Sequence, residues 1–167
     1  TQTLLPNFIE KHPDICAEWD VLFDARGHFS EPHGGKTFGI GTLEVRKYLG
    51  SFWMPSGLQV QAPHLETLFE TDGPAGRFCN VLFIEKEGFL PLLESARIAE
   101  RFDLAIMSTK GLSSTSARWL MESMPSVRFL VLHDFDKAGF SIVGTLQRDT
   151  RRYRFKNPPE IIDLGLR

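Results

Sequence analysis

The chain has 167 residues, of which 42% are hydrophobic and 24% are charged, and its formal net charge is −2. This composition is typical of one compact globular domain, or of one domain with a small appendage, and it excludes a disordered chain, a collagen-like repeat and a coiled coil. The near balance of charge excludes a basic footprint over the whole chain, so a nucleic acid would have to bind a local patch.

The cellular compartment is constrained by two further features. The two cysteines, Cys16 and Cys79, are too few for a disulfide scaffold, so reduced thiols are expected. No apolar stretch is long enough to cross a membrane, and the first residues carry no signal-peptide pattern, so we expect no membrane partner. The absence of an initiator Met suggests a piece of a longer protein. We predict a cytoplasmic, nucleoid-associated protein.

Residues 1–75 predict a smaller, irregular region that precedes the main domain. The apolar run Val21–Phe23 is typical of a short strand, and the glycine- and histidine-rich run Asp24–Gly41 is typical of loops with a hairpin turn. Leu43–Leu49 fits either a strand or a helix. The turn residues of Thr71–Gly76 indicate a boundary. We therefore place the main domain at residues 76–167.

From Arg77 onward, apolar runs of strand length alternate with segments of helical spacing. This alternation predicts an α/β domain, in which helices flank a parallel sheet of about four strands joined by right-handed crossovers. Ser113 or Ser114 can cap the second helix, and Pro125 ends it. The expected strands are Val81–Glu85, Leu104–Ser108, Val127–His133 and Glu160–Leu164, and the expected helices are Gly88–Arg101, about Ser114–Met124 and Ala138–Arg151.

Carboxylates close two of the expected strands. Glu85 ends the first strand, and Asp134 and Asp136 follow the third. In an extended chain both aspartates point the same way, while Phe135 points back into the protein. Ligands of such sheets collect at the carboxyl ends of the strands, and oxygen-only ligands suit Mg²⁺. The alternative is that these acids are helix caps or solvated turns.

Three stretches match a known family. VLFIEKEGFLPLL, STKG and VLHDFDKAGFSI resemble a Toprim domain, most of all that of the topoisomerase VI A subunit and the related meiotic double-strand-break transesterases. The final IIDLGL looks like the segment that closes the Toprim sheet. The resemblance covers about residues 80–166, roughly half of the chain. It implies a Toprim-like Rossmannoid sheet, with residues 1–75 in the place of a connector.

The resemblance also implies roles for individual residues. Glu85 would be the invariant acid of the family, and with Asp134 and Asp136 it would form the catalytic set that holds Mg²⁺, with Mn²⁺ as a substitute. Gly139 would open the third helix. Position 137 is lysine where the family usually has proline. The implied phosphate or DNA contacts are Lys86, Lys110, Gly111 and Lys137.

The source of the nucleophile departs from the family pattern. In the topoisomerases it is a tyrosine on a preceding winged-helix domain, which does not fit into residues 1–75. Tyr48 is the only upstream tyrosine, and a packing role is expected for it. We therefore expect the nucleophile on a missing domain or a partner subunit, with a homodimer as one possibility. Phe89 stands where nucleases of the overcoming-lysogenization-defect type carry an acid, which disfavours a self-sufficient hydrolase.

The function that follows is a Mg²⁺-binding Toprim module of a DNA-processing protein, topoisomerase-like, which does not cut DNA unaided. The alternatives are a metal-dependent nuclease domain of an anti-plasmid or phage-defence system, and a non-catalytic module that binds a nucleotide or a partner.

A group of arginines and two histidines each have more than one interpretation. Arg148, Arg151 and Arg152 share a helical face by their spacing, which suits either a DNA backbone or a solvated surface. His133 is interpreted as a buried strand residue, and the alternative is a hydrogen bond to the metal ligands. His28 matches no zinc-site spacing and is interpreted as a surface or hydrogen-bonded histidine.

Overall fold

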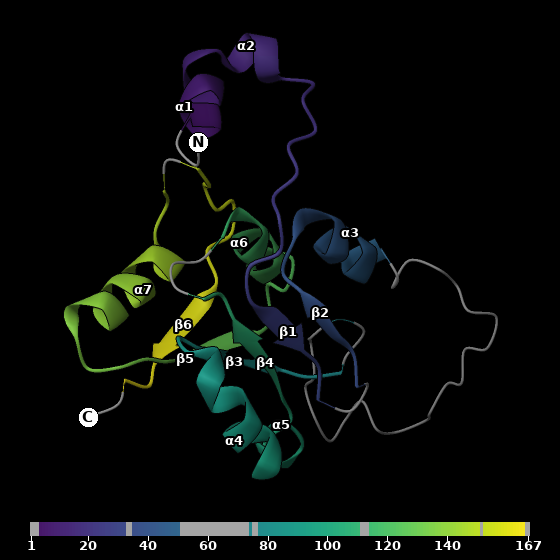
Figure 1. The fold of residues 1–167 in the computed structure, drawn as a ribbon, viewed down its shortest axis with the longest axis vertical. Coiled ribbons are helices and arrows are strands. Elements are labelled where there is room, and N and C mark those ends of the chain that lie inside the picture. The colour runs from purple at the N-terminus through teal and green to yellow at the C-terminus, as the bar shows by residue number, and fades with distance from the viewer. Residues whose placement is uncertain are drawn as a thin grey trace, which may run out of the picture.

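The structure is a computed structural model that describes residues 4–32, 35–50, 74, 77–110, 114–150 and 152–165. It is an α/β fold in which helices flank a six-stranded mixed sheet of order β2-β1-β4-β3-β5-β6 (Figure 1). The strands are β1 His28–Ser30, β2 Thr37–Gly39, β3 Asn80–Ile84, β4 Leu104–Ser108, β5 Arg128–Leu132 and β6 Glu160–Asp163. The helices are α1 Leu4–Lys11, α2 Pro13–Cys16, α3 Thr42–Gly50, η2 Glu87–Phe89 (a 3₁₀ turn), α4 Leu90–Ser95, α5 Ile98–Arg101, α6 Thr115–Glu122 and α7 Lys137–Gln147.

The four strands expected in the second half of the chain are confirmed as β3, β4, β5 and β6, and they pair in parallel. The predicted hairpin in the first half is also present, as the antiparallel pair β1 and β2. The hairpin extends the same sheet, because β1 pairs antiparallel with β4 and sets Phe29 opposite Met107. Most of the expected boundary at residues 71–76 lies outside the described residues, so the division near residue 75 stays a prediction.

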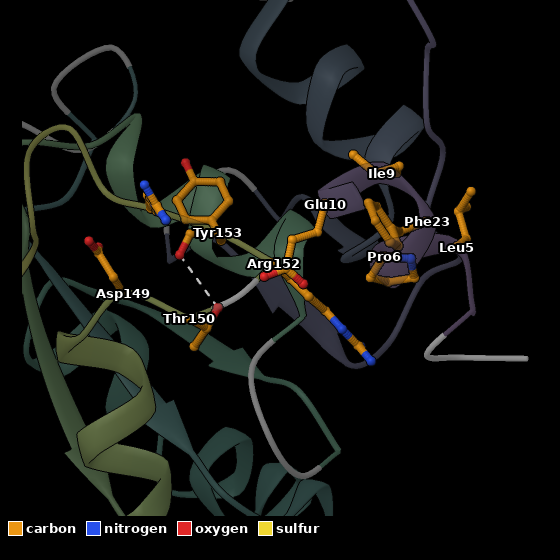
Figure 2. A pocket seen from close by; sticks show the side chains of 10 residues that line it. Leu5, Pro6, Ile9, Glu10, Phe23, Asp149, Thr150, Arg152 and Tyr153 are labelled. Carbon is orange, nitrogen blue, oxygen red and sulfur yellow. Dashed lines mark hydrogen bonds between the residues drawn. The ribbon is translucent and has the colours of Figure 1, made fainter. Parts of the chain in front are cut away.

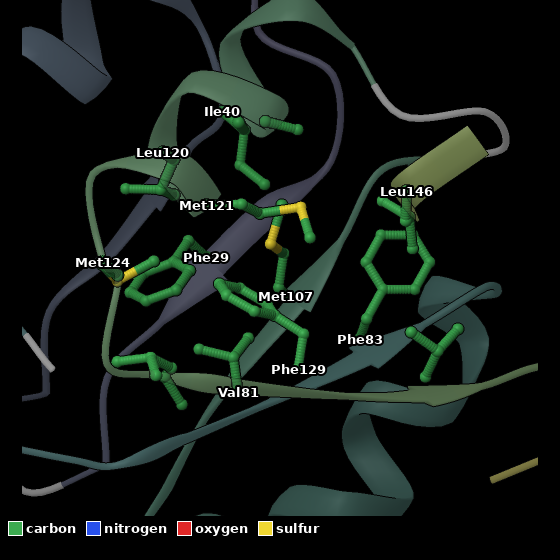
Figure 3. Packing of buried hydrophobic residues seen from close by; sticks show 14 of the residues in the cluster. Phe29, Ile40, Val81, Phe83, Met107, Leu120, Met121, Met124, Phe129 and Leu146 are labelled. Atoms are coloured by element: carbon green, nitrogen blue, oxygen red, sulfur yellow. The ribbon is translucent and has the colours of Figure 1, made fainter. Parts of the chain in front are cut away.

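The two central strands, β3 and β4, bury both of their faces, as expected for a parallel sheet covered by helices. On one face, Val81 and Phe83 of β3 lie in a large core with side chains of α3, α6 and α7 (Figure 3). On the other face, Leu82 and Ile84 pack in a smaller core against α4 and α5. Figure 1 shows the same arrangement, with α4 and α5 on the opposite side of the sheet from α3, α6 and α7.

The first expected helix, Gly88–Arg101, is wrong as a single element. The chain forms the 3₁₀ turn η2 and then two short helices, α4 and α5. The break occurs at Arg97, whose backbone takes the left-handed conformation with φ of 52°. Because the helical spacing does not continue through this turn, Phe89 and Leu92, expected on the apolar face, are 38% and 64% exposed.

The end of the third helix also differs from the expectation. α7 ends at Gln147, and Arg148 already has an extended backbone. The carbonyl of Arg148 accepts a 2.9 Å hydrogen bond from the buried guanidinium of Arg118 in α6, and this contact draws the chain away from the helix axis. Arg152 lies in a turn beyond the helix, and Arg151 lies outside the described residues. A shared helical face of Arg148 and Arg152 is therefore wrong.

Two predictions near the helix starts resolve in different ways. The predicted strand Val21–Phe23 is irregular, because its last residue bonds to the start of α3. Phe23 N–H donates to Thr42 Oγ1 at 2.9 Å, and Thr42 N–H donates to the Phe23 carbonyl at 3.0 Å. The ambiguous run Leu43–Leu49 belongs to α3 and is helical. Ser114 is confirmed as the cap of α6, since its hydroxyl accepts from Ala117 N–H at 3.1 Å.

Candidate metal and phosphate site

The sheet brings the predicted acids to one edge, which we call the carboxyl rim: the ends of β3, β4 and β5 and the start of the antiparallel β1. β3 and β5 are direct neighbours, so Glu85 and Asp134 follow adjacent strands. Glu85 N–H donates to the Leu132 carbonyl at 3.2 Å, and Glu85 Oε2 accepts from Asp134 N–H at 3.2 Å. The Glu85 carboxylate is therefore in direct contact with the backbone of Asp134 across the rim.

Asp136, the third acid, caps a helix. Its Oδ1 accepts from Gly139 N–H at 2.8 Å, in the arrangement that satisfies a free donor in the first turn of α7. Its own N–H donates to the Asp134 carbonyl at 2.8 Å, so the chain makes a tight turn here. The expectation that Phe135 points into the protein is wrong: in this turn it is 66% exposed and contacts the ring of Phe140 edge-on.

A lysine ammonium lies beside one of the three acids. Lys86 forms an ion pair with Asp134. The hydrogen bond with Asp134 raises the pKa of Lys86, burial opposes the rise, and the charges of Asp134, Glu85 and Asp136 add smaller contributions to it. All three predicted acids therefore act on one cationic group.

The rim offers two of the three predicted acids as ligands for a metal ion. Within the described part of the chain, no three His, Cys, Asp or Glu side chains are grouped so that they could hold a metal ion. Mg²⁺ needs only one or two carboxylates, with water and substrate phosphate as its other ligands. The contacting pair Glu85 and Asp134 fits that number and donor type. Asp134 is held by Lys86, so it would have to exchange this partner to bind a metal.

The predicted phosphate contacts separate into different places. Lys86 and Lys110 lie at the rim, each paired with a carboxylate. Lys137 is exposed at the first position of α7, directly after Asp136. Gly111 lies outside the described residues. Arg152 lines a different part of the molecule, described below.

Sequence reasoning missed two rim residues, Glu87 and His28. One Glu87 oxygen contacts His28 Nδ1 at 2.8 Å and accepts from Ser108 Oγ at 3.2 Å, while the other pairs with Lys110 Nζ at 3.2 Å. Partial burial works against ionisation of Glu87, but the hydrogen bonds from His28, Lys110 and Ser108 outweigh it and lower its pKa. The signal in the sequence was the Glu-Lys-Glu spacing after β3, which places a second carboxylate at the same strand end.

His133 is buried under the rim, as interpreted from the sequence. Its Nδ1 lies 2.6 Å from the Asp134 carbonyl and its Nε2 lies 2.9 Å from Asp163 Oδ1. A carbonyl and a carboxylate are both acceptors, so an imidazole that carries a proton on each ring nitrogen satisfies both contacts. Burial lowers the pKa of His133, but the hydrogen bonds to Asp134 and Asp163 and the charges of Asp163 and Glu85 outweigh it and raise the pKa.

The chain has two tyrosines, and each is bonded to a carboxylate. Tyr48 is buried and donates to Glu31, and burial together with that carboxylate raises the pKa of Tyr48. Tyr153 donates to Glu122, and burial and that carboxylate likewise raise the pKa of Tyr153. Both side chains are therefore stabilised as neutral phenols, which is the opposite of an activated nucleophile.

A cavity of about 610 Å³ lies between α1 and the segment after α7 (Figure 2). Leu5, Pro6 and Ile9 line one wall, and Arg152 and Tyr153 line the other. This placement puts Arg152 beside α1, and none of the three predicted acids is among the residues that line the cavity.

Comparison of the chain with family models, with curated proteins and with solved structures gives no match. Among the described residues, no helix combines the length and the apolar character needed to cross a membrane. Both cysteines are free thiols.

Proposed function

We propose that the carboxyl rim is the Mg²⁺- and phosphate-binding site of a Toprim-like module that processes DNA. One observation carries the proposal: Glu85 and Asp134 follow neighbouring parallel strands, the Glu85 carboxylate accepts a hydrogen bond from the backbone of Asp134, and the Asp134 carboxylate is paired with the Lys86 ammonium. Carboxylates gathered at this edge of a parallel sheet need a cation, because like charges in contact repel. The resemblance of the EKEGF and DFDKAG stretches to Toprim sequences supports the same assignment.

The chain's own residues would divide the work at the rim. Glu85 and Asp134 would hold the Mg²⁺, and Asp136 would fix the turn that positions Asp134 while it caps α7. Lys86, once exchanged from Asp134, would be placed to contact a phosphate oxygen. When bound, Mg²⁺ would neutralise the charge of the phosphodiester as it reacts.

The nucleophile in this proposal comes from outside the described rim. Tyr48 and Tyr153 are both tied to carboxylates as phenols, so a tyrosine of another domain or subunit is the better source. That choice corresponds to a topoisomerase-like transesterase. A water molecule in the same role would make the module a nuclease, the alternative function for a defence system.

The proposal is tested by metal binding, which needs no assay of DNA cleavage. Mn²⁺ binding is followed by electron paramagnetic resonance on the wild-type chain and on Asp134→Asn, Glu85→Gln and Lys86→Gln. The two acid variants are expected to bind Mn²⁺ at least about tenfold more weakly, because each loses a charged ligand. Lys86→Gln is expected to bind it more tightly, because the competing ammonium is gone.

Glu94→Gln, an exposed acid on α4, is the matched control and should leave Mn²⁺ affinity unchanged. Equal affinity of the wild type and Asp134→Asn would overturn the proposal. That outcome would favour a non-catalytic module. The Lys86–Asp134 ion pair supports this alternative, because it already neutralises Asp134 without a metal.

A further inference from the structure

His28 belongs to the first half of the chain, yet it lies at the carboxyl rim. β1 runs antiparallel to β4, so the first residue of β1 meets the last residue of β4, and His28 N–H contacts Ser108 Oγ at 3.3 Å. Only one strand, β4, separates β1 from β3. At the usual strand spacing, His28 is about 10 Å across the rim from the end of β3.

A close backbone approach fixes His28 in this place. Gly27 has a φ of +77°, and a Cβ at this position would fall 1.8 Å from the Ser108 carbonyl oxygen. Only glycine combines this left-handed backbone with such close contact to the end of β4. Gly27 therefore allows the backbone to approach β4 closely, which places His28 against the strand ends.

Glu87 orients two basic side chains, those of His28 and Lys110. It engages Nδ1 of His28 with one oxygen and Nζ of Lys110 with the other. Lysine has three donors and a charged histidine has two, so a contact with Glu87 uses one of each set. His28 and Lys110 side chains are 47% and 58% exposed, so solvent and ligands reach them.

We propose that His28 and Lys110, held by Glu87, form a second subsite of the rim that binds a backbone phosphate of DNA. This inference rests on the proposed function, because the rim itself is there assigned to DNA. The subsite takes the phosphate that neighbours the one at Glu85 and Asp134. His28 contacts that phosphate through Nε2, and Glu87 is a positioning residue that holds Nδ1 of the same ring.

The test measures binding of a short fluorescein-labelled DNA oligonucleotide by anisotropy, with and without Mg²⁺. His28→Ala and Lys110→Ala are each expected to weaken binding about tenfold or more, as expected for the loss of a hydrogen bond to a charged group. Lys110→Ala should also lower the slope of log affinity against log salt concentration by about one, and Lys110→Arg should restore it. His12→Ala, an exposed histidine at the start of α2, is the matched control and should bind like the wild type.

A second measurement keeps the test independent of folding of the variants. On the wild-type chain, the side-chain nitrogen resonances of His28 are expected to shift when the oligonucleotide is added, while those of His12 stay in place. Affinity of His28→Ala equal to that of His12→Ala, with no shift at His28, overturns the subsite.

The outcomes also separate this inference from the proposed function. A Mg²⁺-dependent affinity that Asp134→Asn abolishes and His28→Ala leaves intact removes the subsite alone. Weakening by His28→Ala with no effect of Mg²⁺ or of Asp134→Asn removes the metal site and keeps a phosphate site. No binding of DNA by the wild type removes both.

Discussion

At the scale of single residues, the rim depends on a buried histidine, His133, whose pKa is raised. His133 faces the Asp134 carbonyl through one ring nitrogen and the Asp163 carboxylate through the other. The first contact fixes the backbone of Asp134, and the second ties the end of β5 to the end of β6. A proton on this imidazole also offsets the charges of Asp163 and Glu85, the two carboxylates that raise its pKa. The positions of the candidate ligands are therefore linked to the protonation of a residue that cannot itself touch a substrate.

This linkage predicts how stability changes with pH. The folded-state pKa of His133 is raised above the ordinary 6.5, so its contribution is fully present below pH 6.5 and is lost as pH rises through the folded-state value. Asp163→Asn removes the charge that favours the imidazolium. The free energy of unfolding, measured in urea from pH 6 to pH 9, should fall with pH more steeply in the wild type than in Asp163→Asn. Parallel curves would contradict the assignment.

At the scale of elements, α7 begins where two backbone segments touch. A Cβ on Gly139 would lie 2.3 Å from both the Asp134 carbonyl oxygen and His133 Nδ1, and both are parts of the structure that cannot yield easily. This close approach lets Asp136 cap the helix while the turn keeps Asp134 at the rim. The glycine is thus required by packing at the helix start rather than by an unusual backbone angle.

The same helix supplies a matched pair of glycine substitutions. Gly139→Ala should destabilise the protein by about 1–3 kcal/mol, as overpacking does in a tight site. Gly144→Ala, in the same helix with no atom within 4 Å of the added Cβ, should stabilise it by about 0.5–1 kcal/mol. Chemical denaturation measures both. Effects of the same sign in the two variants would show that helix propensity, and not the contact with His133, governs position 139.

Some of these elements follow from the sequence and some do not. β3 and β4 were predictable because strands buried on both faces are unbroken apolar runs, as in Val81–Ile84. The end of α7 was not, because it is set by a hydrogen bond from Arg118 on a different helix. At the rim, the positions of Glu85 and Asp134 followed from strand ends alone. The pairing of Asp134 with Lys86, and the arrival of His28, depend on side-chain and strand contacts that sequence spacing does not encode.

At the scale of the whole molecule, the two halves of the chain share one sheet. β1 and β2 come from the first half, and β1 pairs with β4 of the second. A buried ionic group reinforces this union: the wholly buried carboxylate of Glu31, just after β1, accepts from Tyr48 of α3 and pairs with Arg77, which precedes β3. The Glu31 carboxylate therefore joins three segments that are distant in sequence.

This meeting point predicts a large loss of stability when its cation is removed. Arg77→Met should lower the free energy of unfolding in urea by on the order of 3 kcal/mol, because it leaves the Glu31 charge buried and uncompensated. The double variant Glu31→Gln with Arg77→Met should recover much of the loss, since no charge then remains buried. Arg46→Met removes an ion pair with Asp20 that is exposed on the surface, and it should be close to the wild type. If Arg77→Met were no more destabilising than Arg46→Met, the Glu31 group would not be what joins the two halves of the sheet.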